Sequence, residues 1–184
     1  MMRQLQFFIV PICFLFILGS CGAKRKSSVT GPSKTTVERP SSGKRADVKQ
    51  YYADLLGTNP KELNVLLYEF VDEWMGSPHR MGGQTKSGID CSGFVGVIYQ
   101  QVYGKNLPRS SRDMADVIKR KYDNQLKEGD LVFFSFGGKV IDHVGIYLHN
   151  DKFVHVSTKQ GVVISNLKDP WYYKYFTRCG TPQL

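Results

Sequence analysis

Cys91 lies in the segment GIDCSGF, between an aspartate and a serine and just before an apolar run. The run DCSGFVGVIYQQVYG predicts a helix that begins at or next to Cys91 and ends at Gly104. A helix amino terminus presents unpaired N–H groups and the positive end of the helix dipole, so we expect it to favour the thiolate. Cys91 is therefore a candidate nucleophile, although a lone cysteine is more often a small buried apolar residue.

A cysteine nucleophile needs a base within hydrogen-bond reach, and histidine is the most frequent one. The chain contains four histidines, His79, His143, His149 and His155. Three of them fall in segments 142–149 and 152–158, whose period-two alternation predicts two short strands joined by a tight turn at Asn150. His149 lies at that turn, where we expect exposure.

If these two strands form a hairpin, residues whose numbers sum to about 300 lie opposite each other. Gly145 then faces His155, and His143 lies one diagonal away on the same side. Because Gly145 has no side chain, it leaves room for the two imidazoles to approach. The pattern groups His143 with His155 and leaves His149 outside.

Helices precede these strands. Segment 59–76 predicts a helix capped by Asn59. Its apolar stripe consists of Leu63, Leu66, Leu67, Phe70 and Trp74. A shorter helix is predicted within residues 107–123, with Ser110 or Ser111 as its cap.

After Asp123 the hydrophobic pattern changes to period two. Four short strands are predicted, at residues 129–136, 142–149, 152–158 and 161–167. The aromatic segment PWYYKYFTRCG near the carboxyl end, residues 170–180, is expected to close the sheet. Helices followed by antiparallel strands predict an α+β domain with N-terminal helices packed on an antiparallel sheet.

Residues 1–20 are typical of a signal peptide, with Arg3 followed by an apolar run from about Leu5 to Leu18. The sequence LGSC that follows resembles a bacterial lipobox. This resemblance implies a diacylglyceryl group on Cys21, cleavage before it and acylation of the new amino terminus, which is enough for stable membrane anchoring. The alternative is an ordinary secretory signal with an incidental Cys21.

Residues 21–49 are predicted to be the lipidated cysteine and a polar tether. Gly22 to Ala46 include no Leu, Ile, Met or aromatic residue, so this segment cannot bury enough apolar surface to fold alone. Residues 22–49 carry eight Lys/Arg and two acids, and Arg3 adds one more positive charge, which leaves residues 50–184 with +2 of the net charge of +9. A nearly neutral domain argues against nucleic-acid binding, and a basic tether suits anionic lipid or wall polymer or is a plain solvated linker.

Cysteine usage is consistent with a working thiol. Cys13 is removed with the signal and Cys21 is lipidated, so Cys91 and Cys179 remain in the predicted domain. Exported domains held by disulfides usually have more cysteines, in even number. A Cys91–Cys179 bridge stays open, but a free thiol at Cys91 is favoured.

The segments GIDCSGF, LPRSS, LKEGDLVFF, DHVGIYLHNDKFVHVS and GVVISNL, in this order and spacing, resemble the NlpC-type cysteine peptidases, which include Spr-like lipoproteins. The resemblance covers essentially residues 60–184. It implies a papain-like α+β fold and hydrolysis of amide bonds in the stem peptides of the bacterial cell wall.

The resemblance also implies a role for each matching residue. Cys91 is the nucleophile, His143 is the base that then protonates the leaving amine, and His155 orients His143. The scissile bond is expected to be γ-D-glutamyl–diaminopimelate, a related D,L-type linkage or a cross-link. No metal or organic cofactor is implied, although one cysteine and two histidines are also able to bind zinc.

Four residues are implied on the substrate side. Asp90 and Ser92 flank the nucleophile and are expected to shape the cleft. Arg109, in LPRSS, is a candidate to contact a stem-peptide carboxylate and equally a candidate to fix its loop. His79, in SPHRMGG, stands where similar proteins often have a tyrosine, and it either donates a hydrogen bond to the oxyanion or substrate or is a bystander.

Two classes of function follow: a lipid-anchored wall peptidase, and a non-catalytic wall-binding lipoprotein with the same fold. All three catalytic positions are filled, which favours the peptidase over the scaffold; an amidase or acyltransferase using the same Cys–His pair is a variant of it. The expected location is the bacterial cell envelope. Gly22 and Ala23 follow Cys21 without an acid, which favours the outer membrane, facing the periplasm.

Overall fold

The computed structural model describes residues 45–183. The predicted signal peptide, the lipobox cysteine and residues 22–44 lie outside the described residues, so the expectations for them stay predictions. None of the helices formed by residues 45–183 is long and apolar enough to cross a membrane.

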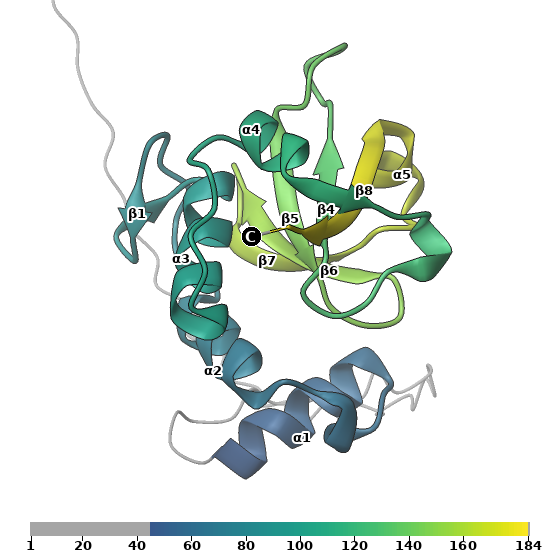
Figure 1. Ribbon diagram of the computed structural model, residues 1–184. Coiled ribbons are helices and arrows are strands. Elements are labelled where there is room, and N and C mark those ends of the chain that lie inside the picture. The colour runs from purple at the N-terminus through teal and green to yellow at the C-terminus, as the bar shows by residue number, and fades with distance from the viewer. Residues whose placement is uncertain (1–44, 184) are drawn as a thin grey trace, which may run out of the picture. The chain divides into compact units, whose positions relative to one another are not determined.

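The amino-terminal half of the described chain is helical. Its helices are α1 (Arg45–Leu56), the short 3-10 helix η1 (Pro60–Glu62), α2 (Val65–Trp74), α3 (Cys91–Tyr103) and α4 (Ser111–Asp116). Figure 1 shows α1, α2 and α3 following one another in space, with α3 lying against the sheet. Their buried side chains join one hydrophobic cluster with the sheet, so tertiary packing stabilises these short helices more than their own propensity does.

The carboxyl-terminal half forms a six-stranded antiparallel sheet in the order β3-β8-β4-β5-β6-β7. The strands are β3 (Ile118–Arg120), β4 (Leu131–Phe134), β5 (His143–Tyr147), β6 (Lys152–Ser157), β7 (Gly161–Asn166) and β8 (Phe176–Pro182). Smaller elements are the ribbon of β1 (Gln84–Thr85) and β2 (Gly88–Ile89), the 3-10 helix η2 (Asp123–Gln125) and α5 (Pro170–Tyr175). The predicted α+β architecture is confirmed, and so are the four predicted strands. The segment at residues 170–180, which was expected to close the sheet, begins instead as helix α5 and joins the sheet only from Phe176, as the inner strand β8 between β3 and β4.

The two faces of the sheet bury different clusters. The face toward α3 holds aliphatic strand residues such as Val144 and Ile146. The opposite face holds Phe134 and Phe153, against which aromatic residues of α5 such as Tyr172 pack. Successive side chains of a strand point to opposite faces, so the period-two pattern produces this division.

The helix predicted over residues 59–76 is interrupted. Asn59 caps η1 as expected, but the chain is extended at Leu63, and Asn64 caps a new helix by accepting a hydrogen bond from the Leu66 N–H at 3.2 Å. Leu66, assigned to the apolar stripe, is 46% exposed. The second capping asparagine competes with the helix for its backbone bonds, which the apolar spacing did not reveal.

The helix predicted within residues 107–123 is shorter than expected. Ser110 caps α4, which ends at Asp116, and β3 follows two residues later. β3 pairs with β8, with Lys119 opposite Thr181. Because the partner strand is far away in the sequence, the local pattern could not indicate this edge strand.

The predicted tether is also shorter than expected. Helix α1 begins at Arg45, and Val48 is only 6% exposed, so the last five residues assigned to the tether belong to the folded part. Packing against α2 explains the difference, because a polar segment with one well-placed apolar side chain can be held by a neighbouring helix.

The β5–β6 hairpin has the predicted register, since Ile146 pairs with Val154 and Tyr147 with Phe153. Its turn contains Asn150 with φ of 48°, a left-handed conformation that asparagine tolerates. The Asn150 side-chain amide also donates to the Leu56 carbonyl at 2.8 Å. The turn is therefore attached to the end of α1.

Gly145 tests how closely β5 and β6 approach. A Cβ at Gly145 would lie 2.8 Å from the Val154 carbonyl oxygen and 3.2 Å from the His155 Cβ, so Gly145→Ala must move β6. We expect it to lower the free energy of unfolding by about 1–3 kcal/mol, measured by urea denaturation.

The matched control is Gly96→Ala, because a Cβ at Gly96 meets only the Met114 Cε, at 4.0 Å, and Gly96 lies inside a helix. This control should leave stability equal or raise it by about 0.5–1 kcal/mol. Equal stability of the two variants would contradict the close approach of β5 and β6.

Candidate active site

The start of α3 is fixed by Asp90, its N-cap. One carboxylate oxygen accepts a hydrogen bond from the Gly93 backbone N–H at 2.7 Å, and the other accepts one from the Gly82 N–H at 2.8 Å. The first bond caps the helix, and the second ties the cap to the loop before β1. Cys91, the first residue of α3, is thus positioned by a carboxylate that is only 6% exposed.

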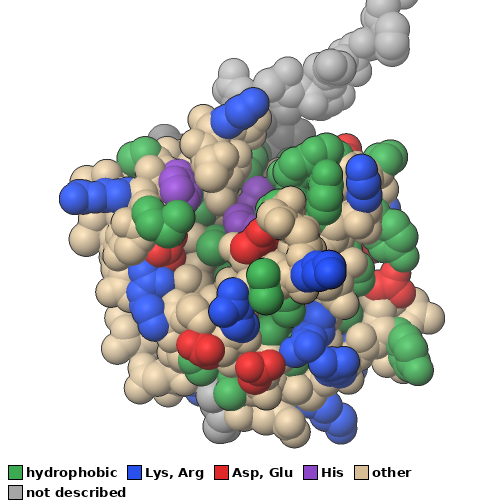
Figure 2. Space-filling view, turned by 90° about the horizontal axis from the view of Figure 1, so that it is seen from above, with side chains coloured by type: hydrophobic (Ala, Val, Ile, Leu, Met, Phe, Trp, Pro, Cys, Tyr) green, Lys and Arg blue, Asp and Glu red, His purple; other side chains and the backbone are tan. Residues whose placement is uncertain are grey.

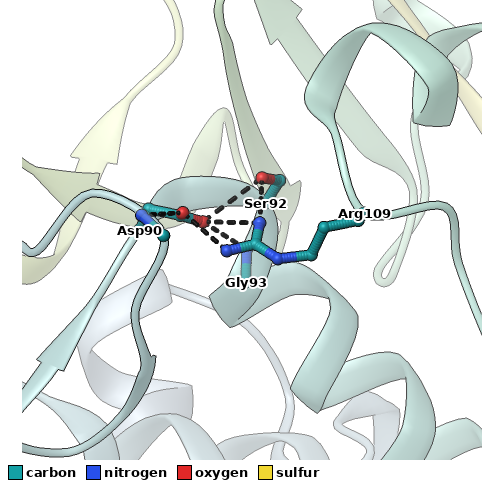
Figure 3. A network of polar contacts seen from close by, with 5 residues as sticks. Asp90, Ser92, Gly93 and Arg109 are labelled. Carbon is teal, nitrogen blue, oxygen red and sulfur yellow. Dashed lines mark hydrogen bonds and ion pairs between the residues drawn. The ribbon is translucent and has the colours of Figure 1, made fainter.

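Arg109 binds the same carboxylate in a bidentate ion pair (Figure 3). Its Nη1 and Nη2 lie 3.0 and 2.7 Å from the two Asp90 oxygens, and Nη1 also donates to the Ser92 Oγ at 2.9 Å. Burial opposes ionisation of Asp90, but the hydrogen bonds from Arg109 and Gly93 outweigh it and lower the pKa of the carboxyl. The geometry favours the loop-fixing role of Arg109, since its guanidinium is already paired.

Cys91 is a partly exposed free thiol at the predicted position. Burial raises the pKa of this thiol above its ordinary value; the Val144 backbone N–H opposes the rise and the Asp90 carboxylate adds to it. The expectation that the helix start yields a thiolate is therefore wrong, because desolvation and a nearby negative charge outweigh the helix terminus. A raised pKa favours the neutral thiol at neutral pH.

His143 and His155 lie together, as predicted. The His143 Nε2 is 2.9 Å from the His155 Nδ1, and the two ring planes are nearly perpendicular at 84°. His143 is the first residue of β5, while His155 lies within β6 and is 2% exposed. The buried His155 is thus placed to orient the His143 ring through this contact.

Aromatic rings surround this histidine pair. The Phe136 ring lies 5.3 Å from His143, and the Phe153 ring stacks 4.8 Å from His155. Burial lowers the pKa of His143 to about 4, although the Asp142 charge opposes the shift. Burial also lowers the pKa of His155 to about 3. Both imidazoles are neutral at neutral pH, so His143 is able to accept a proton.

A cleft of about 710 Å³ runs between the start of α3 and the end of the sheet. Its lining includes Cys91, His143, His79, Asp90, Ser92 and Arg109. Figure 2 shows histidine side chains reaching the surface close to one another. The cleft therefore gathers every predicted catalytic and substrate-side residue except His155, which is buried.

Two candidate groups lie apart from this cleft. His149 lies outside the constellation as expected, but it is partly buried rather than exposed, because its ring contacts Glu128 with 3.1 Å between its Nε2 and the carboxylate. Cys179 is a buried free thiol that donates to the Lys121 carbonyl at 3.2 Å, and burial raises its pKa to about 11. Since both thiols are free, the Cys91–Cys179 bridge left open by the sequence is not formed.

Two polar neighbours of His155 were not predicted from the sequence. The hydroxyls of Ser165 and Tyr172 each lie 3.1 Å from the His155 Nε2. Ser165 pairs with Phe153 in the β6–β7 register, so the same alternation that places the two histidines on one face also places Ser165 there. Tyr172 comes from α5, and no local pattern points to it.

A model of the NlpC/P60 family matches residues 76–181, which include the entire cleft. This chain belongs to the NlpC/P60 family of cysteine peptidases. It is 34% identical over 168 residues to Murein DD-endopeptidase MepS/Murein LD-carboxypeptidase of Escherichia coli (strain K12), covering 91% of this chain and 87% of that protein. The predicted resemblance is therefore confirmed.

For further NlpC/P60 relatives, the match spans a smaller share of the relative's own length. Probable endopeptidase NlpC homolog of Haemophilus influenzae is 42% identical over 107 residues, which are 58% of this chain and 56% of that protein. Among solved structures, an NlpC/P60 family protein from Bacillus cereus has a TM-score of 0.58 and 27% identity. That match covers 64% of this chain, which spans only 39% of the Bacillus protein.

The raised pKa of the Cys91 thiol predicts how its rate of alkylation depends on pH. Because the pKa of Cys91 is raised, its reaction with iodoacetamide should keep accelerating as the pH passes 9.0, the ordinary value for a thiol. Mass spectrometry of the peptide that contains Cys91 measures the rate, with free glutathione as the reference. A rate plateau at neutral pH that disappears in His143→Ala would instead indicate a thiolate–imidazolium pair and contradict the neutral state.

Proposed function

We propose that this chain is a lipid-anchored cysteine endopeptidase that hydrolyses amide bonds in peptidoglycan stem peptides. The observation that carries the proposal is the joint lining of one cleft by Cys91 and His143, with His155 2.9 Å behind His143. A nucleophile, a base and a group that orients the base form the minimum for acyl transfer by this mechanism. The names of the murein-hydrolysing relatives support the same substrate class.

The reaction starts from neutral groups. His143 takes the proton of the Cys91 thiol as the sulfur attacks the scissile carbonyl carbon. A His143 pKa of about 4 keeps the base unprotonated in neutral solution, so it is available for this transfer. The His143 imidazolium is then stabilised by the His155 Nδ1, which accepts a hydrogen bond from the His143 Nε2–H.

The start of α3 supplies the oxyanion site. The first backbone N–H groups of α3, among them that of Cys91, would donate hydrogen bonds to the oxyanion of the tetrahedral intermediate, because the first turn of a helix leaves such donors without an intrahelical partner. The C–N bond then breaks, and the amine leaves with the proton held by His143. A water molecule, deprotonated by His143, hydrolyses the thioester and returns the thiol.

The remaining cleft residues act on substrate orientation. Asp90, Ser92 and Arg109 form a rigid wall beside the nucleophile through their mutual bonds. His79 also lines the cleft, and its ring would donate a hydrogen bond to substrate or oxyanion. We propose a D,L-type bond such as γ-D-glutamyl–diaminopimelate, or a cross-link, as the scissile bond.

The proposed organisation has a signal peptide at residues 1–20, a lipidated Cys21 with a basic tether, and an NlpC/P60 domain. The domain was predicted for residues 50–184, and α1 moves its start to Arg45. The anchor would hold the enzyme in the cell envelope, facing the wall, with the outer membrane as the favoured site.

Digestion of peptidoglycan tests the activity. A soluble form from Val37 to Leu184 retains all of α1 and the whole hydrophobic core. We expect new stem-peptide fragments by mass spectrometry, with masses that identify the cut bond, and a loss of at least about 1,000-fold for Cys91→Ala and His143→Ala.

Two variants provide matched controls in this assay. Cys179→Ala removes the other free thiol, and His149→Ala removes a histidine outside the cleft, so both should keep activity. If the unaltered protein cuts no stem peptide under reducing conditions yet binds peptidoglycan, the non-catalytic wall-binding function replaces the peptidase.

The anchor is tested separately in cells. The full chain should incorporate labelled palmitate and fractionate with membranes, whereas Cys21→Ser should lose both properties because acyl chains supply the membrane affinity. Cys13→Ser, within the predicted signal, should change neither. Membrane association of the Cys21→Ser variant equal to that of the unaltered chain would exclude lipid anchoring at this residue.

A further inference from the structure

His155 has partners on both of its ring nitrogens. Its Nδ1 faces the His143 Nε2 at 2.9 Å, and its Nε2 lies 3.1 Å from the Ser165 Oγ and 3.1 Å from the Tyr172 hydroxyl. The two hydroxyls also contact each other, with Ser165 donating to Tyr172 at 3.2 Å. A continuous chain of hydrogen bonds therefore runs from the cleft to α5 on the outer face of the sheet.

The direction of the protons in this chain decides whether His143 is a base. For His143 to accept a proton at Nδ1, its neutral form must carry the proton on Nε2, which then donates to the His155 Nδ1. His155 must in turn carry its own proton on Nε2. The reverse order would leave His143 with a proton on Nδ1, which is unable to take another from the thiol.

Ser165 and Tyr172 satisfy the required order. If Ser165 donates its hydrogen bond to the Tyr172 hydroxyl oxygen, 3.2 Å away, its lone pairs are left to accept from the His155 Nε2–H. His155 is 2% exposed, so its Nε2–H depends on protein acceptors. Without them, a buried N–H would be left unpaired, and the opposite tautomer would become competitive.

The placement of Tyr172 is specific. Asp169 caps α5 by accepting from the Trp171 N–H at 2.9 Å, and the Tyr172 ring packs edge-on against Phe153 at 5.2 Å. The ring therefore has its own apolar contacts, and the hydroxyl projects toward His155 from a separately anchored element. Packing alone would be served equally well by phenylalanine.

We infer that Ser165 and Tyr172 are positioning residues that hold His155 in the Nε2–H tautomer and thereby keep His143 in the tautomer that accepts the thiol proton. This inference rests on the proposed peptidase function. Both hydroxyls contact the His155 Nε2, so either one partly replaces the other as its acceptor. The Nε2–H is left without an acceptor only when both hydroxyls are removed.

Kinetics of the full chain in detergent provide the first test. Tyr172→Phe and Ser165→Ala should each lower kcat by only about two- to threefold, whereas the double variant should lower it about 10- to 100-fold with KM unchanged. In the Tyr172→Phe background, Ser165→Thr retains a hydroxyl and should restore most of the activity. The matched control is Tyr173→Phe, because that hydroxyl of α5 bonds to Asp123 instead.

Histidine ring ¹⁵N chemical shifts provide a test that does not depend on turnover. In the unaltered chain the His155 Nε2 should have the shift of a protonated nitrogen and its Nδ1 that of an unprotonated one, and the double variant should show a mixture. A protonated Nδ1 in the unaltered chain, or losses in the double variant equal to the product of the single losses, would overturn the inference. If the unaltered chain cuts no substrate, the proposed function fails while the shifts still decide the tautomer.

Discussion

The carboxylate of Asp90 joins parts of the chain that are otherwise independent. It caps α3, holds the loop before β1 through Gly82 and receives the guanidinium of Arg109. Because Cys91 follows directly, the position of the sulfur relative to the sheet depends on this one group. A buried carboxylate with several donors is stable only when all of them are present, which couples the loop, the helix and the Arg109 segment.

Burial sets the protonation state of the site. It raises the pKa of Cys91 and lowers that of His143 to about 4, so both resting groups are neutral. The unfolded chain binds a proton at His143 near the ordinary value of 6.5, whereas the folded chain does so only near 4. Between these values the unfolded state holds more protons, so this residue makes folding less favourable as the pH falls. Burial therefore keeps His143 unprotonated in neutral solution, and it lowers the stability of the folded chain in acid.

Local sequence was sufficient where contacts are close in the chain. The start of α3 at Cys91, its end at Gly104 and the β5–β6 register follow from a cap, a glycine and a tight turn. The pairing of His143 with His155 follows from the same register, since alternation along a strand fixes which side chains share a face. The order and spacing of the sequence motifs also indicated the family, and the family indicated the class of reaction.

Only the tertiary structure decided the elements and charges that depend on distant partners. β3 exists because β8 lies beside it, and α1 starts within the predicted tether because Val48 packs into the core. The pKa of the thiol is raised because the surrounding chain removes water from Cys91, an effect that a helix terminus alone does not reveal. Tyr172 reaches His155 from α5 across the outer face of the sheet. The sequence by itself determined which residues could react and on which elements they lie; packing across long sequence separations decided their protonation and their supports, because desolvation and hydrogen bonding depend on everything that surrounds a group.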